Sequence, residues 1–130
     1  MGTGAISWCS RLQSIVALST TEAEYVAATS AGQEILWLRN LFHELGYTIS
    51  MPSTLFIDNC SALSVAKNPE HHGRMKHLDL RFYWLRNAVD KGTINIVHLR
   101  TDAMPADVLT KALGRVKVIE MVERLGLTKG

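Results

Sequence analysis

The feature that most constrains this chain of 130 residues is a long helical pattern that begins at a capping signal near Ser19. Glu22 follows three residues later, the spacing at which a serine hydroxyl and a glutamate side chain cap one helix start. Apolar residues then recur with helical spacing as far as Gly46, a residue type that commonly ends helices. We therefore predict a helix over residues 22–45.

One acidic residue is in line with the apolar face of this predicted helix. At about 100° per residue, the positions that share the face are Glu24, Ala28, Ala31, Ile35, Leu38, Phe42 and Leu45. Glu22 falls on the opposite side, where we expect a solvated carboxylate. A carboxylate that faces the core needs a cation, a metal ion or hydrogen-bond donors. The alternative is that Glu24 occupies a partly wet first turn, where the helix dipole favours an acid.

Composition indicates a globular protein, with 47% hydrophobic and 20% charged residues. We expect a single domain over residues 1–130. The net charge of +2 is too small to indicate nucleic-acid binding by itself. Cys9 and Cys60 lack the number and spacing of a disulfide framework or a metal site, so we expect reduced cysteines that fill space as small apolar side chains. With neither a signal peptide nor a membrane-spanning run, we expect an intracellular protein with no membrane partner.

Strand and helix patterns alternate along the chain, which is typical of an α/β protein. The run Thr54–Ile57 is apolar throughout, so we predict a strand that is buried on both faces. Pro105 stands at a plausible first helical position. The predicted strands are residues 5–12, 15–18, 54–57 and 93–99. The further predicted helices are residues 61–66, a helix from Leu78 that ends at Lys91-Gly92, and residues 105–113 and 115–125.

Two further acids stand where ligands or helix caps are common. Asp58 follows the third predicted strand at its carboxyl end, where open α/β sheets bind ligands; alternatively, Asp58 or Asn59 caps the next helix. Asp107 lies in the first turn after Pro105, where the helix dipole alone favours an acid, and Asp102 is an alternative acid nearby. Carboxylates that converge can bind a hard cation such as Mg²⁺. Such a site can activate water for phosphodiester cleavage.

A basic segment surrounds the start of the second long helix, with Arg74, Lys76, His77, Arg81 and Arg86 and, off the apolar stripe, Tyr83 and Trp84. Cations for phosphates and aromatic rings for bases would suit a nucleic acid. The alternative is a solvated face with Trp84 packed against a neighbouring helix.

For the histidines we expect structural or surface roles rather than metal binding or catalysis. His71, His72 and His77 are expected to be surface residues rather than zinc ligands. His98 is expected to be a hydrogen-bonded strand histidine rather than a group for proton transfer.

Several stretches match one known family in the family's own order. They are Ile6-Ser7-Trp8 with Val16 to Tyr25, Ile57-Asp58-Asn59 with Ser61-Ala62, His72 to Asp79, and Ala106 to Lys111. Over about residues 5–113 the chain resembles the ribonuclease H domain of Ty1/copia-type retrotransposon (reverse transcriptase) polyproteins.

This resemblance implies a ribonuclease H-like mixed sheet flanked by helices and hydrolysis of the RNA strand of an RNA–DNA hybrid. It implies that Glu24, Asp58 and Asp107 are three of the four acids that bind two Mg²⁺ ions. It selects Glu24 over Glu22, as the helical pattern does. The hybrid would be the partner of the basic segment, with phosphates held by Arg74, Lys76, His77 and Arg81.

The chain departs from the family at its start. The family's fold opens with a central strand that carries the first catalytic aspartate, and nothing like it precedes Gly4. We therefore expect an incomplete metal site, negligible activity of this chain alone, and exposed sheet edges that self-associate or pair with an upstream polyprotein segment. The alternative is a catalytically silent remnant that acts as a nucleic-acid or protein interaction module. The cytoplasm, the nucleus or a retroelement particle would be its location.

Overall fold

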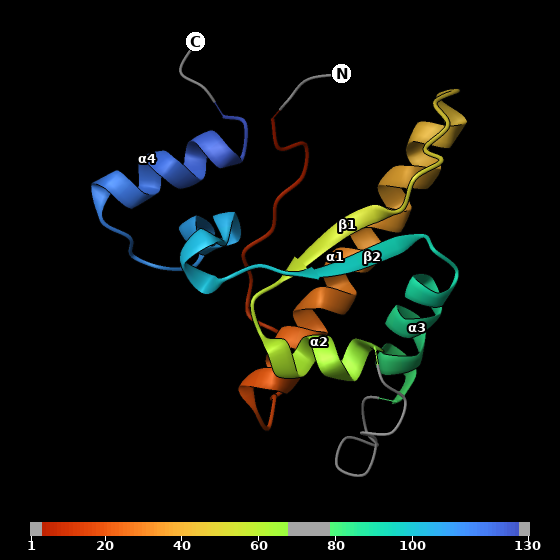
Figure 1. The fold of residues 1–130 in the computed structure, drawn as a ribbon, viewed down its shortest axis with the longest axis horizontal. Coiled ribbons are helices and arrows are strands. Elements are labelled where there is room, and N and C mark those ends of the chain that lie inside the picture. Colours follow the sequence, from red (N-terminus) through yellow and green to blue (C-terminus); the bar gives the residue numbers. More distant parts are fainter. Residues whose placement is uncertain (1–3, 68–78, 128–130) are drawn as a thin grey trace. The chain divides into compact units, whose positions relative to one another are not determined.

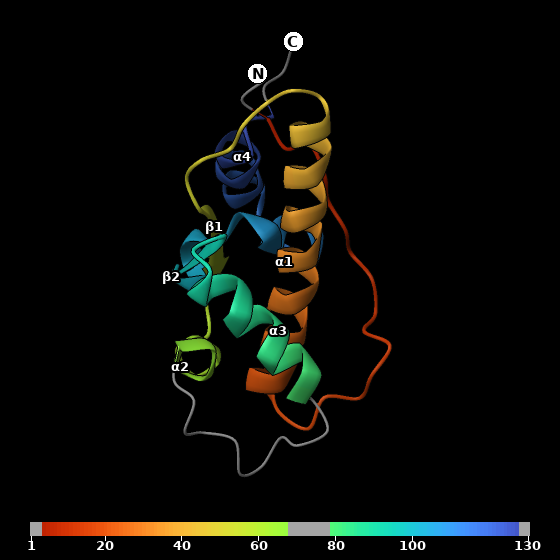
Figure 2. The ribbon, with the colours of Figure 1, turned by 90° about the vertical axis from the view of Figure 1, so that its right-hand side faces the viewer.

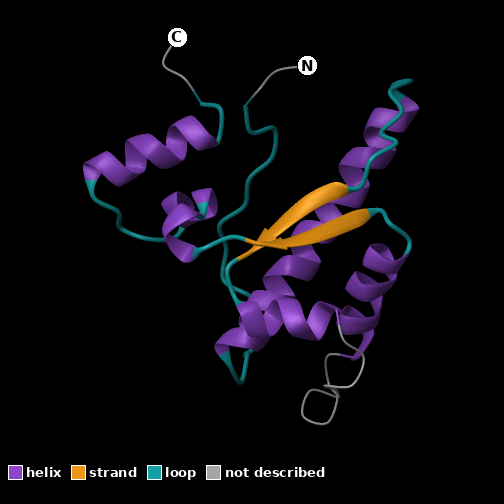
Figure 3. Cartoon of the chain, in the orientation of Figure 1, coloured by secondary structure: helices purple, strands orange, loops and turns teal. Residues whose placement is uncertain are grey.

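The computed structural model describes residues 4–67 and 79–127, and the chain separates into two compact units. The sheet unit comprises residues 15–98, and the terminal unit comprises residues 1–14 together with 99–130. Among the described residues, four α-helices, two short 3₁₀ helices and a pair of parallel strands make this a mixed α/β protein (Figures 1 and 3). This confirms the predicted α/β class.

Helix α1 (Thr20–Glu44) lies close to the predicted bounds of 22–45 and between the predicted end signals, Ser19 and Gly46. The Ser19 hydroxyl accepts a hydrogen bond from the Glu22 amide at 3.1 Å, and Glu22 Oε2 accepts one from the Leu18 amide at 2.8 Å. The two side chains thus satisfy backbone donors that the first turn leaves open. At the other end Gly46 has a φ of +85°, a left-handed conformation that glycine adopts without strain.

The buried face of α1 matches the predicted one only in part: Ala28 is buried and Ile35 packs against the core, as predicted. Tyr25, Val26, Thr29 and Gly32 are buried together with Glu22, which is only 1% exposed, whereas Ala31 is exposed. The prediction that Glu22 is solvated is therefore wrong. Its carboxylate can be buried because it accepts the Leu18 amide hydrogen, which offsets part of the desolvation cost.

Strands β1 (Ser53–Ile57) and β2 (Ile94–His98) pair in parallel, in a register that runs from Ser53 opposite Ile94 to Ile57 opposite His98. Figure 2 shows α1 on one side of the two strands. The inward side chains pack with α1, α2 (Cys60–Lys67) and α3 (Asp79–Asp90) in one core: Leu55, Ile57, Ile94 and Ile96.

The outward face of the strand pair is open to solvent over the described residues. Phe56 is 48% exposed and Val97 is 36% exposed. The prediction that the strand at Thr54–Ile57 is buried on both faces is therefore wrong, because the described helices of this unit cover only one face.

Gly32 of α1 lies where the helix meets α3 and β2. A Cβ atom added there would lie 3.1 Å from Trp84 Cζ3, 3.2 Å from Ile94 Cδ1 and 3.3 Å from Leu85 Cδ1. Leu85 and Ile94 are fully buried, so they have little room to move away.

We expect Gly32→Val to destabilise the sheet unit by about 2 kcal/mol, because overpacking a dense core typically costs about 1–3 kcal/mol. Urea unfolding would measure the effect. The matched control is Ala31→Val, which adds the same β-branched side chain at an exposed position of the same helix. If the two variants were equally stable, the residues packed around Gly32 would have moved to accommodate valine, and the expected destabilisation would be contradicted.

The N-terminal stretch does not form the two strands predicted for residues 5–12 and 15–18. Residues 5–19 form no helix or strand, and Ile6, Trp8 and Val16 are 67%, 74% and 88% exposed. An apolar strand gains little without a neighbouring strand, because its backbone groups then remain hydrogen-bonded to water.

Both cysteines are also placed differently from the prediction. Cys9 and Cys60 have free thiols, as expected, but both are exposed. The expectation that they fill space as small apolar side chains is wrong.

The terminal unit is built around η4 (Pro105–Leu109) and α4 (Arg115–Arg124), with the short turn η3 (Thr101–Ala103) before them. Pro105 does stand at a first helical position, but the helix predicted over 105–113 is a 3₁₀ turn that ends at Leu109. Within this unit the Ala5 amide donates to the Leu125 carbonyl oxygen at 2.9 Å. This hydrogen bond joins the N-terminal stretch to the residue that follows α4.

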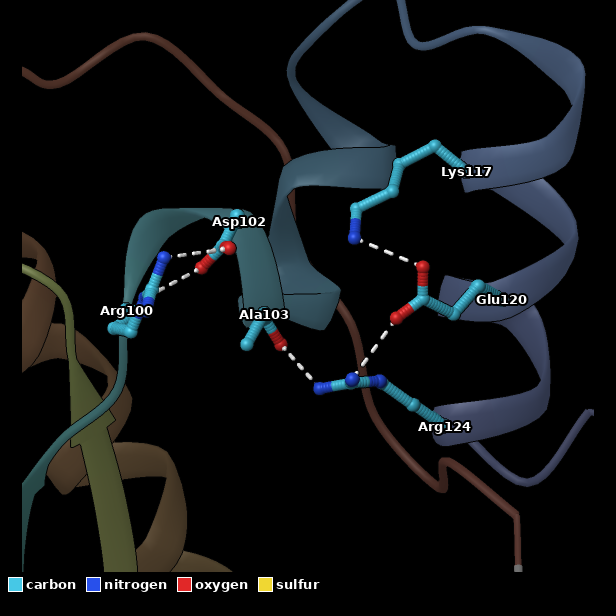
Figure 4. A network of polar contacts seen from close by, with 6 residues as sticks. All are labelled: Arg100, Asp102, Ala103, Lys117, Glu120 and Arg124. Carbon is cyan, nitrogen blue, oxygen red and sulfur yellow. Dashed lines mark hydrogen bonds and ion pairs between the residues drawn. The ribbon is translucent and has the colours of Figure 1, made fainter.

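Charged side chains join α4 to the turn η3 in the terminal unit (Figure 4). Glu120 accepts hydrogen bonds from Lys117 and Arg124, both at 2.9 Å, and Arg124 also donates to the Ala103 carbonyl oxygen at 3.0 Å. The hydrogen bond from Lys117 is the main cause that lowers the pKa of Glu120.

Candidate functional site

Asp58 is the acid whose surroundings are best defined. It follows β1 directly and is half-buried. The next residue, Asn59, caps α2: its Oδ1 accepts hydrogen bonds from the Ser61 amide at 2.9 Å and the Ala62 amide at 3.1 Å. The capping role that the sequence left open between Asp58 and Asn59 therefore belongs to Asn59.

The Asp58 carboxylate makes no hydrogen bond or ion pair with any residue that the structure describes. Its backbone does have a partner, because the Nε2–H of His98 donates to the Asp58 carbonyl oxygen, with 3.1 Å between the two atoms. This agrees with the expectation of a hydrogen-bonded strand histidine at position 98. The sequence alone did not indicate that its acceptor would be Asp58.

Glu24 lies in the first turn of α1, in the same unit as Asp58, and is half-buried. Both explanations offered for Glu24, a metal ligand or an acid favoured by the helix dipole, are consistent with a half-buried side chain in a first turn. The buried acid of this turn is Glu22, and its carboxylate is engaged in the cap. Glu22 therefore has a structural role.

Asp107 belongs to the terminal unit, in the first turn of η4. Its carboxylate pairs with Lys111 at 2.8 Å, and its side chain is 16% exposed. Asp102, the alternative acid, is exposed and pairs with Arg100 at 3.1 Å (Figure 4). The convergence of Asp107 with Glu24 and Asp58, which belong to the sheet unit, stays a prediction.

The donor atoms on offer suit Mg²⁺, which prefers carboxylate oxygens and retains several waters. Asp58 supplies such a carboxylate without a competing partner in the described chain. Over residues 4–67 and 79–127, no three His, Cys, Asp or Glu side chains are grouped as a metal site. Chemically, the Asp58 carboxylate fits the ion.

Most of the proposed nucleic-acid contacts, namely Arg74, Lys76 and His77, lie outside the described residues, as do His71 and His72. Arg81 is half-buried on α3. Trp84 packs against the core, as the structural alternative predicted, while Tyr83 is 71% exposed.

Arg86, the remaining cation of the basic segment, is turned toward the interior of the sheet unit. One Nη of Arg86 donates to the Val65 carbonyl oxygen at 3.2 Å. Burial raises the pKa of Tyr25 to about 12, and the positive charge of Arg86 opposes that rise. Arg86 is therefore part of the packing between α2 and α3 rather than an exposed phosphate contact.

Fold and site together define a mixed α/β protein with an available acid at the carboxyl end of a parallel strand. No helix of the described residues has the length and apolar character needed to cross a membrane. No protein-family model and no solved structure matches the chain.

Curated proteins do match, and three of them share one description. The chain is 44% identical over 124 residues to the retrovirus-related Pol polyprotein from transposon TNT 1-94 of Nicotiana tabacum, which covers 95% of the chain. It is 38% and 36% identical, over 99% of its length, to the corresponding polyproteins from transposons RE2 and RE1 of Arabidopsis thaliana. The chain spans only 9% of the length of each of these polyproteins. It is therefore related to one segment of transposon Pol polyproteins.

Proposed function

We propose that this chain forms part of a ribonuclease H-like domain of a copia-type retroelement polyprotein. When complete, this domain would hydrolyse the RNA strand of RNA–DNA hybrids with Mg²⁺. The observation that carries the proposal is Asp58, a half-buried acid at the carboxyl end of a parallel strand whose carboxylate is left available because Asn59 caps α2. The relatedness to Pol polyproteins supports the same origin.

In this proposal Glu24, Asp58 and Asp107 hold the metal ions. Bound Mg²⁺ supplies an activated water and stabilises the leaving oxygen in phosphodiester cleavage. The protein's part is to fix the carboxylates: β1 and the cap at Asn59 hold Asp58, and the first turns of α1 and η4 carry Glu24 and Asp107. Lys111 pairs with Asp107 and would compensate its charge when no cation is present.

In this proposal a fourth acid completes the metal site. The resemblance implies that this acid lies on a central strand of the sheet, next to β1. That strand would also pair with the edge of β1 that has no strand beside it among the described residues. We propose that an upstream polyprotein segment supplies both the strand and the acid, and that two copies of the chain otherwise associate through the exposed edges.

The test compares the 130 residues alone with the same residues joined to the segment that precedes the matched region in the Nicotiana tabacum polyprotein. The joined protein should cleave the RNA strand of a hybrid with Mg²⁺, and neither a DNA duplex nor a reaction with chelator should give products. Failure to cleave under any condition would reject the catalytic proposal. Hybrid binding without cleavage would instead favour the interaction module.

The hybrid itself is a proposed partner, held through the basic segment. We expect Arg74→Ala with Lys76→Ala to weaken hybrid binding and to lower the salt slope of log K by roughly 2, because each lost phosphate contact reduces it by about 1. Binding titrations at several salt concentrations would measure this. The control is Arg100→Ala, which removes an exposed cation already paired with Asp102. A salt slope equal to that of the unaltered chain would identify the segment as ordinary solvated surface.

A further inference from the structure

The connection between β1 and α2 is fixed on its sheet side by a side chain. The parallel ladder ends at the pair Ile57 and His98, so the Asp58 carbonyl lies one residue beyond the last backbone pairing. The Nε2–H of His98 donates to this carbonyl oxygen at 3.1 Å. The imidazole thus continues the ladder by one hydrogen bond at the residue that carries the proposed metal-binding carboxylate.

The same connection is fixed on its helix side by Asn59. Its Oδ1 accepts hydrogen bonds from the Ser61 and Ala62 amides, which anchors Asn59 to the first turn of α2. Asp58 therefore lies between two hydrogen-bonded points, one on its own carbonyl and one on the next side chain. Neither point uses the Asp58 carboxylate.

We propose that His98 is a positioning residue for Asp58, holding its backbone so that the carboxylate keeps one orientation for a divalent cation. The inference rests on the proposed function and names a residue that would touch neither metal nor nucleic acid. The role needs a hydrogen-bond donor at the place of Nε2, not a proton transfer. A glutamine at position 98 can place an amide N–H at a similar reach, whereas a leucine cannot donate.

The first experiment uses the 130-residue chain without metal and follows the carbonyl ¹³C resonance of Asp58. We expect His98→Leu to move this resonance upfield, because the carbonyl loses its donor, and His98→Gln to return it toward the position in the unaltered chain. The control is Asn95→Leu, at an exposed position of the same strand, which should leave it in place. An unchanged Asp58 carbonyl resonance in His98→Leu would overturn the proposal.

The second experiment uses the chain joined to the upstream polyprotein segment, with Mn²⁺ as a paramagnetic probe of carboxylate sites. In His98→Leu we expect broadening of the Asp58 and Asn59 amide resonances to need about 10-fold more Mn²⁺, since outer-shell partners typically account for about 10–100-fold. His98→Gln should recover most of this loss. In cleavage assays kcat should fall while KM for the hybrid stays the same.

The outcomes separate the two proposals. If the joined protein responds equally to Mn²⁺ with and without His98→Leu, the positioning role of His98 is overturned and the proposed function is not affected. If the unaltered joined protein shows neither Mn²⁺ broadening at Asp58 nor cleavage, the proposed function fails. The carbonyl resonance of the metal-free chain then still decides whether His98 holds the Asp58 backbone.

Discussion

Replacing Asp58 with asparagine is expected to reduce Mg²⁺-dependent hybrid cleavage by the completed protein at least about 100-fold, because even outer-shell partners of a metal site account for about 10–100-fold. Asparagine keeps the size of the side chain but removes the negative charge that a hard cation requires. Cleavage rates at saturating hybrid would measure the loss.

The fold should survive this change. The Asp58 carboxylate makes no hydrogen bond or ion pair with the described residues, and Asn59 caps α2 in its place. The urea midpoint of Asp58→Asn should therefore match that of the unaltered protein. Asp102→Asn is the matched control, because this exposed acid pairs only with Arg100 in the described chain and should be dispensable. Retained cleavage in Asp58→Asn, or loss in Asp102→Asn, would show that the acids are wrongly assigned.

We also expect the 130 residues on their own to form a dimer or a larger assembly. This assembly should show negligible hybrid cleavage. The outer face of the two-stranded sheet exposes Phe56 and Val97 over the described residues. The N-terminal stretch adds Ile6 and Trp8, both mostly exposed. Burying these side chains between copies is favourable at about 25 cal/mol per Å² of apolar surface.

Light scattering over a range of concentrations would measure the assembly. Phe56→Lys should shift the chain toward monomer, because a charge on an open strand opposes pairing with another sheet. Ala31→Lys adds the same charge on the exposed side of α1 and should leave the assembly unchanged. A stable monomer at all concentrations would contradict the assembly, and Mg²⁺-dependent cleavage by the 130 residues alone would contradict the expected inactivity.

The sequence was sufficient to predict a helix or strand wherever its stability depends on residues close by in the chain. Ser19 and Glu22 set the start of α1, Gly46 sets its end, and Pro105 sets the start of η4, because caps and special backbone angles act within one turn. The strands at Ser53–Ile57 and Ile94–His98 were also predicted, since each is a short apolar or alternating run bounded by polar residues.

Predictions failed where the answer depends on distant parts of the chain. Residues 5–12 have a strand-like pattern, but a strand exists only when another strand offers it hydrogen bonds. Likewise, the inward face of α1 depends on distant residues such as Trp84, Leu85 and Ile94 near Gly32, and Glu22 is buried rather than solvated.

The candidate site divides in the same way. The sequence by itself singled out Glu24, Asp58 and Asp107, because their residue types and places at element ends suit a hard cation. Only the tertiary structure decided that Asn59 takes the cap, that the Asp58 carboxylate stays available, and that His98 donates to the Asp58 carbonyl. That last contact joins residues 40 apart in sequence, and the parallel register of β1 and β2 brings them together.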